Sequence, residues 1–374
     1  MKPILNRIPE TLLLGPGPSC VSKEVREALA QHTIGHLDPS FIEIMDDIKT
    51  LLQVVMNTDN QLTFPISGTG SAGMETCFVN LIEPGDSVLV LSNGVFGTRM
   101  VDVAKRLGAN LDVLEFPWGT PVLADQVATQ LQAKSYRLVA MVHAETSTGV
   151  CNPVPEIGAL VREEEGTLFL VDAVTSLGGI PVQTDLWGVD ALYSGTQKCV
   201  SCPPGLSPIS FSDGAVAKLQ SRQTKVPNWY LDLSLIVGYW QGGTRSYHHT
   251  APINMLYGLS QALQSIEDEG LEKVHARHRE VHELLVSGLE NLGLELLVDP
   301  RCRLPMLNAV RVPSGIDEAE VRASLLERDR IEIGGGLGPL AGKIWRIGLM
   351  GYSAQGENVL RLLEALEKHI PVDN

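Results

Sequence analysis

Two residues at the ends of predicted strands could do chemistry together. The run 193–198 (YSGTQK) has the pattern of buried strand and turn but ends in Lys198, and a lysine is rarely buried without a reason. Desolvation makes its amine a nucleophile that can bond to an aldehyde cofactor. Asp172 follows a short apolar strand predicted at 168–171. That is the strand end at which open α/β sheets bind ligands.

A carboxylate followed by a reactive lysine suits pyridoxal phosphate. The carboxylate of Asp172 would keep the pyridine nitrogen protonated, so that the ring can take up electrons, while Lys198 would hold the aldehyde. The alternative is that Asp172 caps a helix and Lys198 lies on the surface of a turn. These two positions alone leave both interpretations open.

The elements that must position these residues alternate along the chain. Short apolar runs predict strands, and amphipathic stretches predict helices between them. This alternation predicts an α/β fold with a mostly parallel central sheet covered by helices on both faces. The predicted strands are 87–91, 111–114, 138–142 and 168–171, and helices are predicted at 21–31, 40–55, 99–107 and 157–164.

The chain divides into a predicted arm and two predicted domains. Residues 15–18 (GPGP) cannot continue a regular helix or strand, so 1–18 is predicted to be an irregular N-terminal arm of the kind that lies on another subunit. Residues 19–265 form the predicted large domain. A helical stretch at 254–292, broken at Gly270, leads into a predicted small C-terminal α+β domain, 266–374, with helices at 318–327 and 358–369.

A glycine-rich loop at 68–73 (GTGSAG) precedes the predicted helix 74–81 and fits the dinucleotide-binding pattern. The acidic residue that such a site needs after the next strand is missing, because Leu91 leads into Ser92 and Asn93. A nicotinamide oxidoreductase is therefore disfavoured. A single phosphate at the helix N-terminus fits the same loop, and a turn whose glycines serve only packing is the alternative.

Four further stretches are binding-site candidates. Phe96 lies between glycines in a strand-to-helix turn at 93–97, where its ring could stack on a planar ligand or could belong to the core. The polar loop 143–149 directly follows an apolar strand. Arg346 lies in an apolar strand and needs a carboxylate partner, which could be a structural Asp or Glu or a substrate. The cluster 247–250 (YHHT) is either a boundary loop or a loop donated to a phosphate or substrate.

The composition indicates a globular protein and excludes some partners. The 374 residues are 44% hydrophobic and 20% charged, with a net charge of −15, which argues against non-specific nucleic-acid binding. We find no signal peptide and no apolar run of transmembrane length, so no membrane partner is expected. Six scattered cysteines are too few for a disulfide framework and predict a reducing, cytoplasmic setting.

Two other patterns of metal-ligating residues are weak. Cys199 and Cys202 form a single CxxC without a second pair, so zinc or redox chemistry is disfavoured. His275, His278 and His282 have near-helical spacing but do not form HExxH, and a solvated helix face is predicted for them. We therefore expect no metal site.

Taken in order, these stretches resemble the class V, fold type I, pyridoxal-phosphate aminotransferases, especially the alanine:glyoxylate and serine:pyruvate or serine:glyoxylate group. The resemblance covers nearly the whole chain. Its marks are GPGP at 15–18, SGTG at 67–70, NGVFG at 93–97, HAETSTG at 143–149, DAV at 172–174, SGTQK at 194–198, YHHT at 247–250 and WRIG at 345–348. It departs at Phe96, where well-known members have Trp.

The resemblance implies a role for each matching residue. Lys198 and Asp172 would be catalytic: the lysine would bond to the cofactor and move the proton, and the carboxylate would pair with the pyridine nitrogen. Arg346 would hold the substrate carboxylate, with Gly17 beside the substrate. The other cofactor-binding residues would be Thr69, Gly70, Ser71 and Gln197 at the phosphate, Tyr247 and Thr250 of the neighbouring subunit at the same phosphate, Phe96 and Val174 against the ring, and Thr146 near the ring oxygen.

The activity implied is transfer of an amino group from alanine or serine to glyoxylate or pyruvate by a ping-pong mechanism, in a homodimer with the active site at the interface. Several alternatives share the fold. A ureidoglycine- or pyridoxamine-using transaminase is one, and a catalytically silent pyridoxal-phosphate protein is another. A cysteine desulfurase or other lyase is a third, for which Cys302 is the thiol best placed in the sequence.

Overall fold

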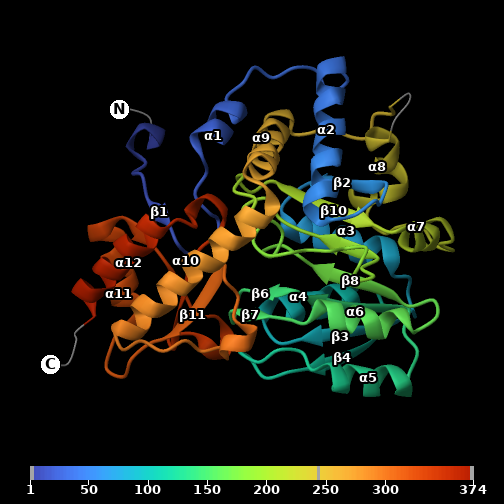
Figure 1. Cartoon of the computed structure of the whole chain (residues 1–374). Coiled ribbons are helices and arrows are strands. Elements are labelled where there is room, and N and C mark those ends of the chain that lie inside the picture. Colours follow the sequence, from blue (N-terminus) through green and yellow to red (C-terminus); the bar gives the residue numbers. More distant parts are fainter. Residues whose placement is uncertain (1–3, 242–244, 371–374) are drawn as a thin grey trace.

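The computed structural model describes residues 4–241 and 245–370, and a seven-stranded sheet forms the centre of the larger lobe (Figure 1). Its strand order is β2-β10-β9-β8-β5-β3-β4. Among these strands, only β10 runs in the opposite direction to the others. The strands are β2 (Leu62–Ser67), β3 (Ser87–Ser92), β4 (Asn110–Glu115), β5 (Leu138–Val142), β8 (Leu168–Asp172), β9 (Ala191–Tyr193) and β10 (Leu206–Phe211).

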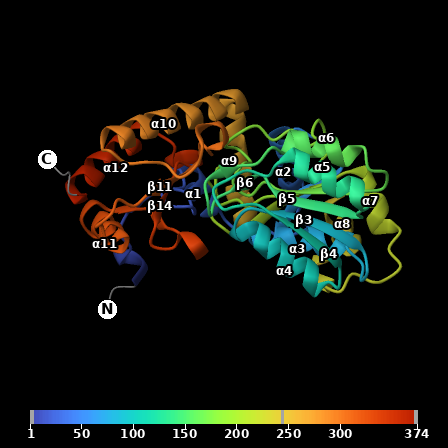
Figure 2. The ribbon, with the colours of Figure 1, turned by 90° about the horizontal axis from the view of Figure 1, so that it is seen from below.

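Helices cover both faces of this sheet, as seen from below in Figure 2. Helices α3 (Gly70–Leu81) and α4 (Val95–Arg106) lie on one face, and α5 (Ala124–Ala133) and α6 (Val154–Arg162) lie on the other. This arrangement buries β5 and β8 on both sides, which is why they are continuous apolar runs. The fold is therefore α/β with a mostly parallel sheet, as predicted.

Long helices flank the sheet near β2 and lead to the second lobe. Helix α2 (Pro39–Met56) begins where Asp38 accepts the N–H of Ser40, and ends at Asn57 in the left-handed conformation. The predicted break at Gly270 separates α9 from α10. The other helices are α1 (Lys23–Leu29), α7 (Asp213–Gln220), α8 (Leu233–Trp240), α9 (Ile253–Glu269), α10 (Leu271–Asn291), α11 (Glu318–Ser324) and α12 (Gly356–His369).

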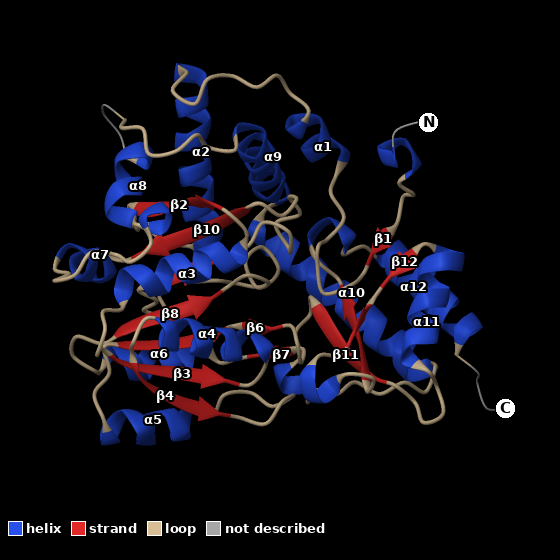
Figure 3. Cartoon of the chain, turned by 180° about the vertical axis from the view of Figure 1, so that it is seen from behind, coloured by secondary structure: helices blue, strands red, loops and turns tan. Residues whose placement is uncertain are grey.

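The second lobe is built on the antiparallel sheet β11-β14-β13, with α10, α11 and α12 packed around it (Figure 3). Its core includes Leu285, Trp345 and Leu362. The strands of this lobe are β11 (Leu307–Arg311), β12 (Ile331–Glu332), β13 (Gly334–Gly335) and β14 (Ile344–Gly348).

The N-terminal segment differs in part from the prediction. Residues 1–18 were expected to be irregular, but Leu12–Leu13 forms β1, which pairs in parallel with β12, and Leu14 is buried in the second core. Residues 1–3 lie outside the described residues. This pairing joins segments far apart in the sequence, so local patterns could not predict it. The contact of the arm with another subunit stays a prediction.

The division at 265/266 also stays a prediction. The larger hydrophobic core extends beyond it to Ile266 and Val274, and residues 371–374 of the predicted small domain lie outside the described residues. Among the helices described, none is long and apolar enough to cross a membrane.

Candidate active site

The carboxyl ends of two neighbouring strands bring Asp172 and Tyr193 together. Strands β8 and β9 are parallel, and their register pairs these two residues. The chain then turns through 194–197 to Lys198. All three side chains line one cavity of about 230 Å³. Asp172 therefore lies at the end of a strand, as the sequence predicts, and Lys198 follows a turn from the neighbouring strand.

Lys198 is half-buried and packs against the N-terminal segment. Its amine donates to the carbonyl oxygen of Pro16, and a Cβ at Gly17 would overlap that amine. The Oγ of Ser19 donates to the carbonyl oxygen of Lys198 at 2.8 Å. Burial lowers the pKa of Lys198 to about 8, and the nearby Arg346 contributes in the same direction. A substantial fraction of this amine is therefore neutral and nucleophilic near neutral pH.

Asp172 is buried and holds two hydrogen bonds. Its Oδ1 accepts the N–H of Val174 at 2.7 Å, and its Oδ2 accepts the hydroxyl of Tyr193 at 2.7 Å. Burial raises the pKa of Asp172 to about 7, although both hydrogen bonds oppose the rise. A cation placed beside this carboxylate would keep it ionised. A protonated ring nitrogen is a group of that kind.

The glycine-rich loop opens α3 directly beside the lysine turn. Thr69 precedes the helix, and the first turn leaves the N–H groups of Gly70 and Ser71 without intrahelical acceptors. The Oε1 of Gln197 is buried and has no hydrogen-bond partner among the described residues. All four residues line the same cavity. They form a cradle for a phosphate group.

The aromatic turn places Phe96 on the wall of this cavity, as predicted. Its N–H donates to Oε2 of the buried Glu145 at 3.1 Å, so that carboxylate caps the start of α4. The guanidinium of Arg99 lies 4.9 Å from the centre of the Phe96 ring. Glu145 therefore holds the backbone of Phe96, and Arg99 lies against its ring.

Arg346 reaches toward the cavity from β14 of the second lobe. Its Nε donates to the carbonyl oxygen of Gly335 at 2.7 Å, and its Nη1 to that of Thr146 at 3.3 Å. Within the described residues it has no ion-pair partner. Burial lowers the pKa of Arg346, and the carboxyl of Glu145 opposes the shift. The structural Asp or Glu considered as its partner is thus not found there.

Three of the predicted cofactor-binding residues do not line the cavity, and neither do the predicted substrate-binding residues Arg346 and Gly17. Thr146 is buried beside it and contacts Arg346 through its carbonyl oxygen. Tyr247 is 60% exposed, and its hydroxyl lies 3.4 Å from Oγ1 of Thr250. A single chain therefore does not bring Tyr247 and Thr250 to its own phosphate cradle.

Sequence reasoning missed several residues of the cavity wall. Tyr193 received no role, although the parallel register of two strand ends could have paired it with Asp172. Arg99 lies one helical turn after Phe96, a spacing that places both on one face. Met74 also lines the cavity. Glu145 lies in the predicted loop, but its capping of α4 depends on tertiary contact.

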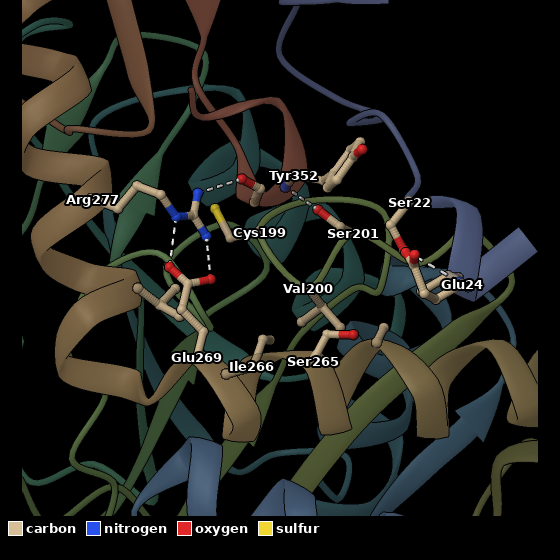
Figure 4. Close-up of a pocket in the computed structure, with 14 residues that line it drawn as sticks. Ser22, Glu24, Cys199, Val200, Ser201, Ser265, Ile266, Glu269, Arg277 and Tyr352 are labelled. Carbon is tan, nitrogen blue, oxygen red and sulfur yellow. Dashed lines mark hydrogen bonds and ion pairs between the residues drawn. The ribbon is translucent and has the colours of Figure 1, made fainter. Parts of the chain in front are cut away.

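A second layer supports the lysine turn from behind (Figure 4). Ser201 has a left-handed backbone, with φ 56°, and its Oγ accepts the N–H of Tyr352 at 2.7 Å. The carbonyl oxygen of Gly351 accepts from Arg277 at 2.8 Å. Arg277 also forms a 2.7 Å ion pair with Glu269 beside a cavity of about 190 Å³. The second lobe thereby holds the turn that carries the lysine.

The predicted solvated position of His278 is wrong. Its side chain is fully buried, its Nδ1 donates to the carbonyl oxygen of Val274 at 2.7 Å, and its Nε2 accepts the N–H of Gly351 at 2.9 Å. Burial lowers the pKa of His278 to about 4, so the ring is neutral. Cys199 and Cys202 are buried around the lysine turn. Among the described residues, no group of three or more His, Cys, Asp or Glu side chains could hold a metal ion.

The donor set fits pyridoxal phosphate. Backbone N–H groups at the start of α3 that can donate to a phosphate, a desolvated lysine amine and a carboxylate that needs a cation line one cavity. Gly17 and Gly70 leave room there, since a Cβ at Gly70 would lie 3.3 Å from Cγ2 of Val174.

Comparisons with known proteins agree with this fit. The profile of the family "Aminotransferase class-V" matches residues 18–358. Alanine–glyoxylate aminotransferase of Rattus norvegicus is 43% identical over 96% of this chain and 88% of its own length. The (S)-ureidoglycine–glyoxylate transaminase of Bacillus subtilis is 38% identical over 96% of this chain and 90% of its own. The crystal structure of alanine–glyoxylate aminotransferase from Nostoc sp. superposes with a TM-score of 0.95 and 49% identity, covering 96% of this chain and 95% of that one. The chain therefore belongs to the class V aminotransferase family, and it is a fold type I transaminase that uses pyridoxal 5'-phosphate.

Proposed function

We propose that this transaminase moves an amino group from a small amino acid, alanine or serine, to glyoxylate or pyruvate. The observation that carries the proposal is that Arg346 lies near Lys198. A guanidinium without an ion-pair partner among the described residues lies near an amine whose pKa is lowered to about 8. Similar proteins from rat and Nostoc are named alanine–glyoxylate aminotransferases, which supports these substrates.

Four residues of the site would each have a defined role in the reaction. Arg346 binds the α-carboxylate of the substrate by paired hydrogen bonds, and Gly17 leaves space beside the amine. The Nζ of Lys198 removes the proton from the α-carbon of the substrate and holds it for return. When bound, pyridoxal phosphate withdraws electrons from the bond that breaks. Asp172 stabilises the positive charge on the ring nitrogen.

The remaining residues would hold the cofactor in place. Thr69, Gly70, Ser71 and Gln197 bind its phosphate, Phe96 and Val174 enclose its ring, and Thr146 lies near the ring oxygen. Tyr247 and Thr250 would complete the phosphate site of the partner subunit in a homodimer, since both side chains are exposed on the surface of a single chain. Release of one keto acid before binding of the next gives ping-pong kinetics. We also infer a cytoplasmic setting from the six free cysteines.

A ureidoglycine donor is the second candidate, because a relative of that name is 38% identical over nearly the whole chain. Both activities use glyoxylate and differ only in the amino donor. A desulfurase is less well supported. Cys302 lines a different cavity, together with Cys151 and Trp187, and not the one that contains Lys198.

The donor can be identified by following each half-reaction separately. Purified holoenzyme is mixed with alanine, serine, (S)-ureidoglycine, pyridoxamine or cysteine without any keto acid, and the cofactor absorbance is recorded in a stopped-flow instrument. We expect alanine or serine to convert the cofactor fastest, and glyoxylate or pyruvate to reverse the change. Faster conversion by ureidoglycine or pyridoxamine, or sulfide release from cysteine, would contradict the proposal.

The matched control is Lys198→Ala, which keeps the rest of the cavity. Because the lysine moves the proton, we expect turnover to fall by at least about 10²-fold. Turnover at the rate of the unmodified protein would exclude Lys198 as the proton-transfer residue.

A further inference from the structure

Two free cysteines, Cys151 and Cys302, lie on neighbouring segments, one in the hairpin near the active site and the other just before β11 of the second lobe. Val150 and Arg303 form an isolated antiparallel bridge. In an antiparallel pair, one step forward on the first segment matches one step back on the second. This register places Cys151 opposite Cys302, and opposed side chains point to the same face with Cβ atoms about 4.5–5.5 Å apart.

The surroundings of the two thiols agree with this register. The N–H of Leu304 donates to the carbonyl oxygen of Gly149 at 3.0 Å, the next contact of the same pairing. Cys151 and Cys302 line one cavity of about 850 Å³, and both are free and only partly buried. Opposed residues of antiparallel segments have Cα separations of about 4.5–5.5 Å, within the range that a disulfide spans.

The two cysteines lie in different parts of the fold. Cys151 ends β7 (Val150–Cys151), which pairs with β6 (Ala144–Glu145) in the hairpin that carries Thr146. Cys302 ends the 3₁₀ turn Pro300–Cys302, just before β11 of the second lobe. A bond between them would tie the hairpin that supports Phe96 and Arg346 to the second lobe.

We propose that Cys151 and Cys302 are a redox modification site, which closes to an intramolecular disulfide on exposure to a small-molecule disulfide such as oxidised glutathione. Burial and the nearby Asp299 raise the pKa of Cys302, and Arg301 and Arg303 oppose the rise, whereas deeper burial raises the pKa of Cys151 to about 12. Cys302 is therefore the attacking group.

The exchange balances in two steps. The Cys302 thiolate attacks one sulfur of the oxidised reagent, forms a mixed disulfide and releases the first reagent thiolate. Cys151 then loses its proton and attacks the Cys302 sulfur, which releases the second reagent thiolate. Two electrons pass from the cysteine pair to the reagent, and its two thiolates take up the two protons. A reduced dithiol reverses both steps.

Mass spectrometry of the holoenzyme tests this proposal. The protein is incubated with oxidised glutathione at mildly alkaline pH, the remaining thiols are alkylated, and it is digested without reduction. We expect the intact protein to lose the mass of two hydrogen atoms, and the digest to contain a peptide that links Cys151 to Cys302. Dithiothreitol should remove both signals.

The single variants sharpen the test because each leaves one partner. Cys151→Ser should retain a stable glutathione adduct on Cys302, and Cys302→Ser should give neither the adduct nor the cross-link. Cys20→Ser, which keeps the pair, should behave like the unmodified chain. Absence of the cross-link in the unmodified protein, or a loss of the mass of two hydrogen atoms from either single variant of the pair, would overturn the proposal. So would a bond from either cysteine to Cys20.

Discussion

At the scale of single residues, Lys198 and Asp172 deviate in opposite directions for one reason. Burial disfavours the charged form of each, so the pKa of Lys198 falls to about 8 and that of Asp172 rises to about 7. Pyridoxal phosphate would relieve both costs, because the lysine becomes covalently bound and the carboxylate gains a cation. The burial of these two groups therefore favours the protein with pyridoxal phosphate bound.

The lysine makes the loading of cofactor dependent on pH. Only the neutral amine attacks an aldehyde, and the folded-state pKa of about 8 lies below the ordinary 10.5. We expect the rate at which apo-enzyme binds pyridoxal phosphate covalently to rise about tenfold per pH unit below about 8, and to level off above it. Stopped-flow absorbance measures this rate. A rate that keeps rising to pH values near the ordinary pKa of lysine would show that burial does not lower the pKa.

The hydroxyl of Tyr193 favours the ionised form of Asp172, and Tyr193→Phe removes only that hydroxyl. A hydrogen bond to a charged group contributes about 1.5–3 kcal/mol, so the pKa of Asp172 should rise by about 1–2 units. We expect the affinity for pyridoxal phosphate to fall about tenfold or more at neutral pH. Equilibrium titration of the apo-enzyme measures it.

The chain contains a matched control for this change. The hydroxyl of Tyr136 donates to Oδ2 of Asp112 at 2.6 Å, away from the cavity. Tyr136→Phe should leave cofactor affinity unchanged while removing a hydrogen bond of the same kind. If both variants lost affinity equally, the effect of Tyr193 would be one on folding and not on Asp172.

At the scale of elements, the lysine turn is positioned by a segment far along the chain. Gly351 has φ 52°, and a Cβ there would lie 2.5 Å from the carbonyl oxygen of Cys199. The Nε2 of His278 accepts the N–H of this glycine, and the N–H of Tyr352 donates to the Oγ of Ser201. The second lobe therefore supports the turn that carries Lys198, while the N-terminal segment contacts its amine.

His278→Leu should disturb this position. It leaves the N–H of Gly351 buried without an acceptor, so we expect the free energy of unfolding to fall by about 1–3 kcal/mol and cofactor to dissociate faster. His278→Gln keeps an acceptor and should restore both values in large part. Denaturant titration and cofactor release followed by absorbance measure the two effects.

His282→Leu is the control on the same helix, since Nδ1 of His282 bonds to Asn308 and not to the lysine turn. It should lower stability without changing cofactor release. Equal cofactor release from the Leu variants at both positions would show that the Gly351 contact has no special effect on the lysine.

Local patterns predicted many of the elements but not their long-range contacts. The strand before Asp172 and the break at Gly270 follow from apolar runs and from glycine itself, and both were found. Helix α4 begins at Val95, before the predicted 99, because Glu145 from a distant loop caps it. The buried place of His278 depends on the second lobe, which helical spacing alone does not reveal.

At the scale of the whole molecule, one chain supplies most of the cavity wall but leaves two predicted phosphate ligands elsewhere. Tyr247 and Thr250 do not line the cavity that contains Lys198. A closed two-fold dimer would offer the same loop to both sites. Whether these residues act within the chain or across an interface therefore decides how many subunits a functional site needs.

Mixing two inactive variants distinguishes these cases. One variant carries Lys198→Ala with an intact loop, and the other carries Tyr247→Phe and Thr250→Ala with an intact lysine. If the loop acts across a two-fold dimer, a mixed dimer has one site with the intact lysine of one chain and the intact loop of the other. We expect the mixture, after subunit exchange in mild denaturant, to recover turnover that neither variant shows alone. If the loop serves its own chain, every site in the mixture keeps a defect and turnover stays at the level of the separate variants. A different affinity tag on each variant, with dimers that retain both tags isolated in two successive steps, confirms that mixed dimers have formed, so that failure of recovery then assigns the loop to its own chain.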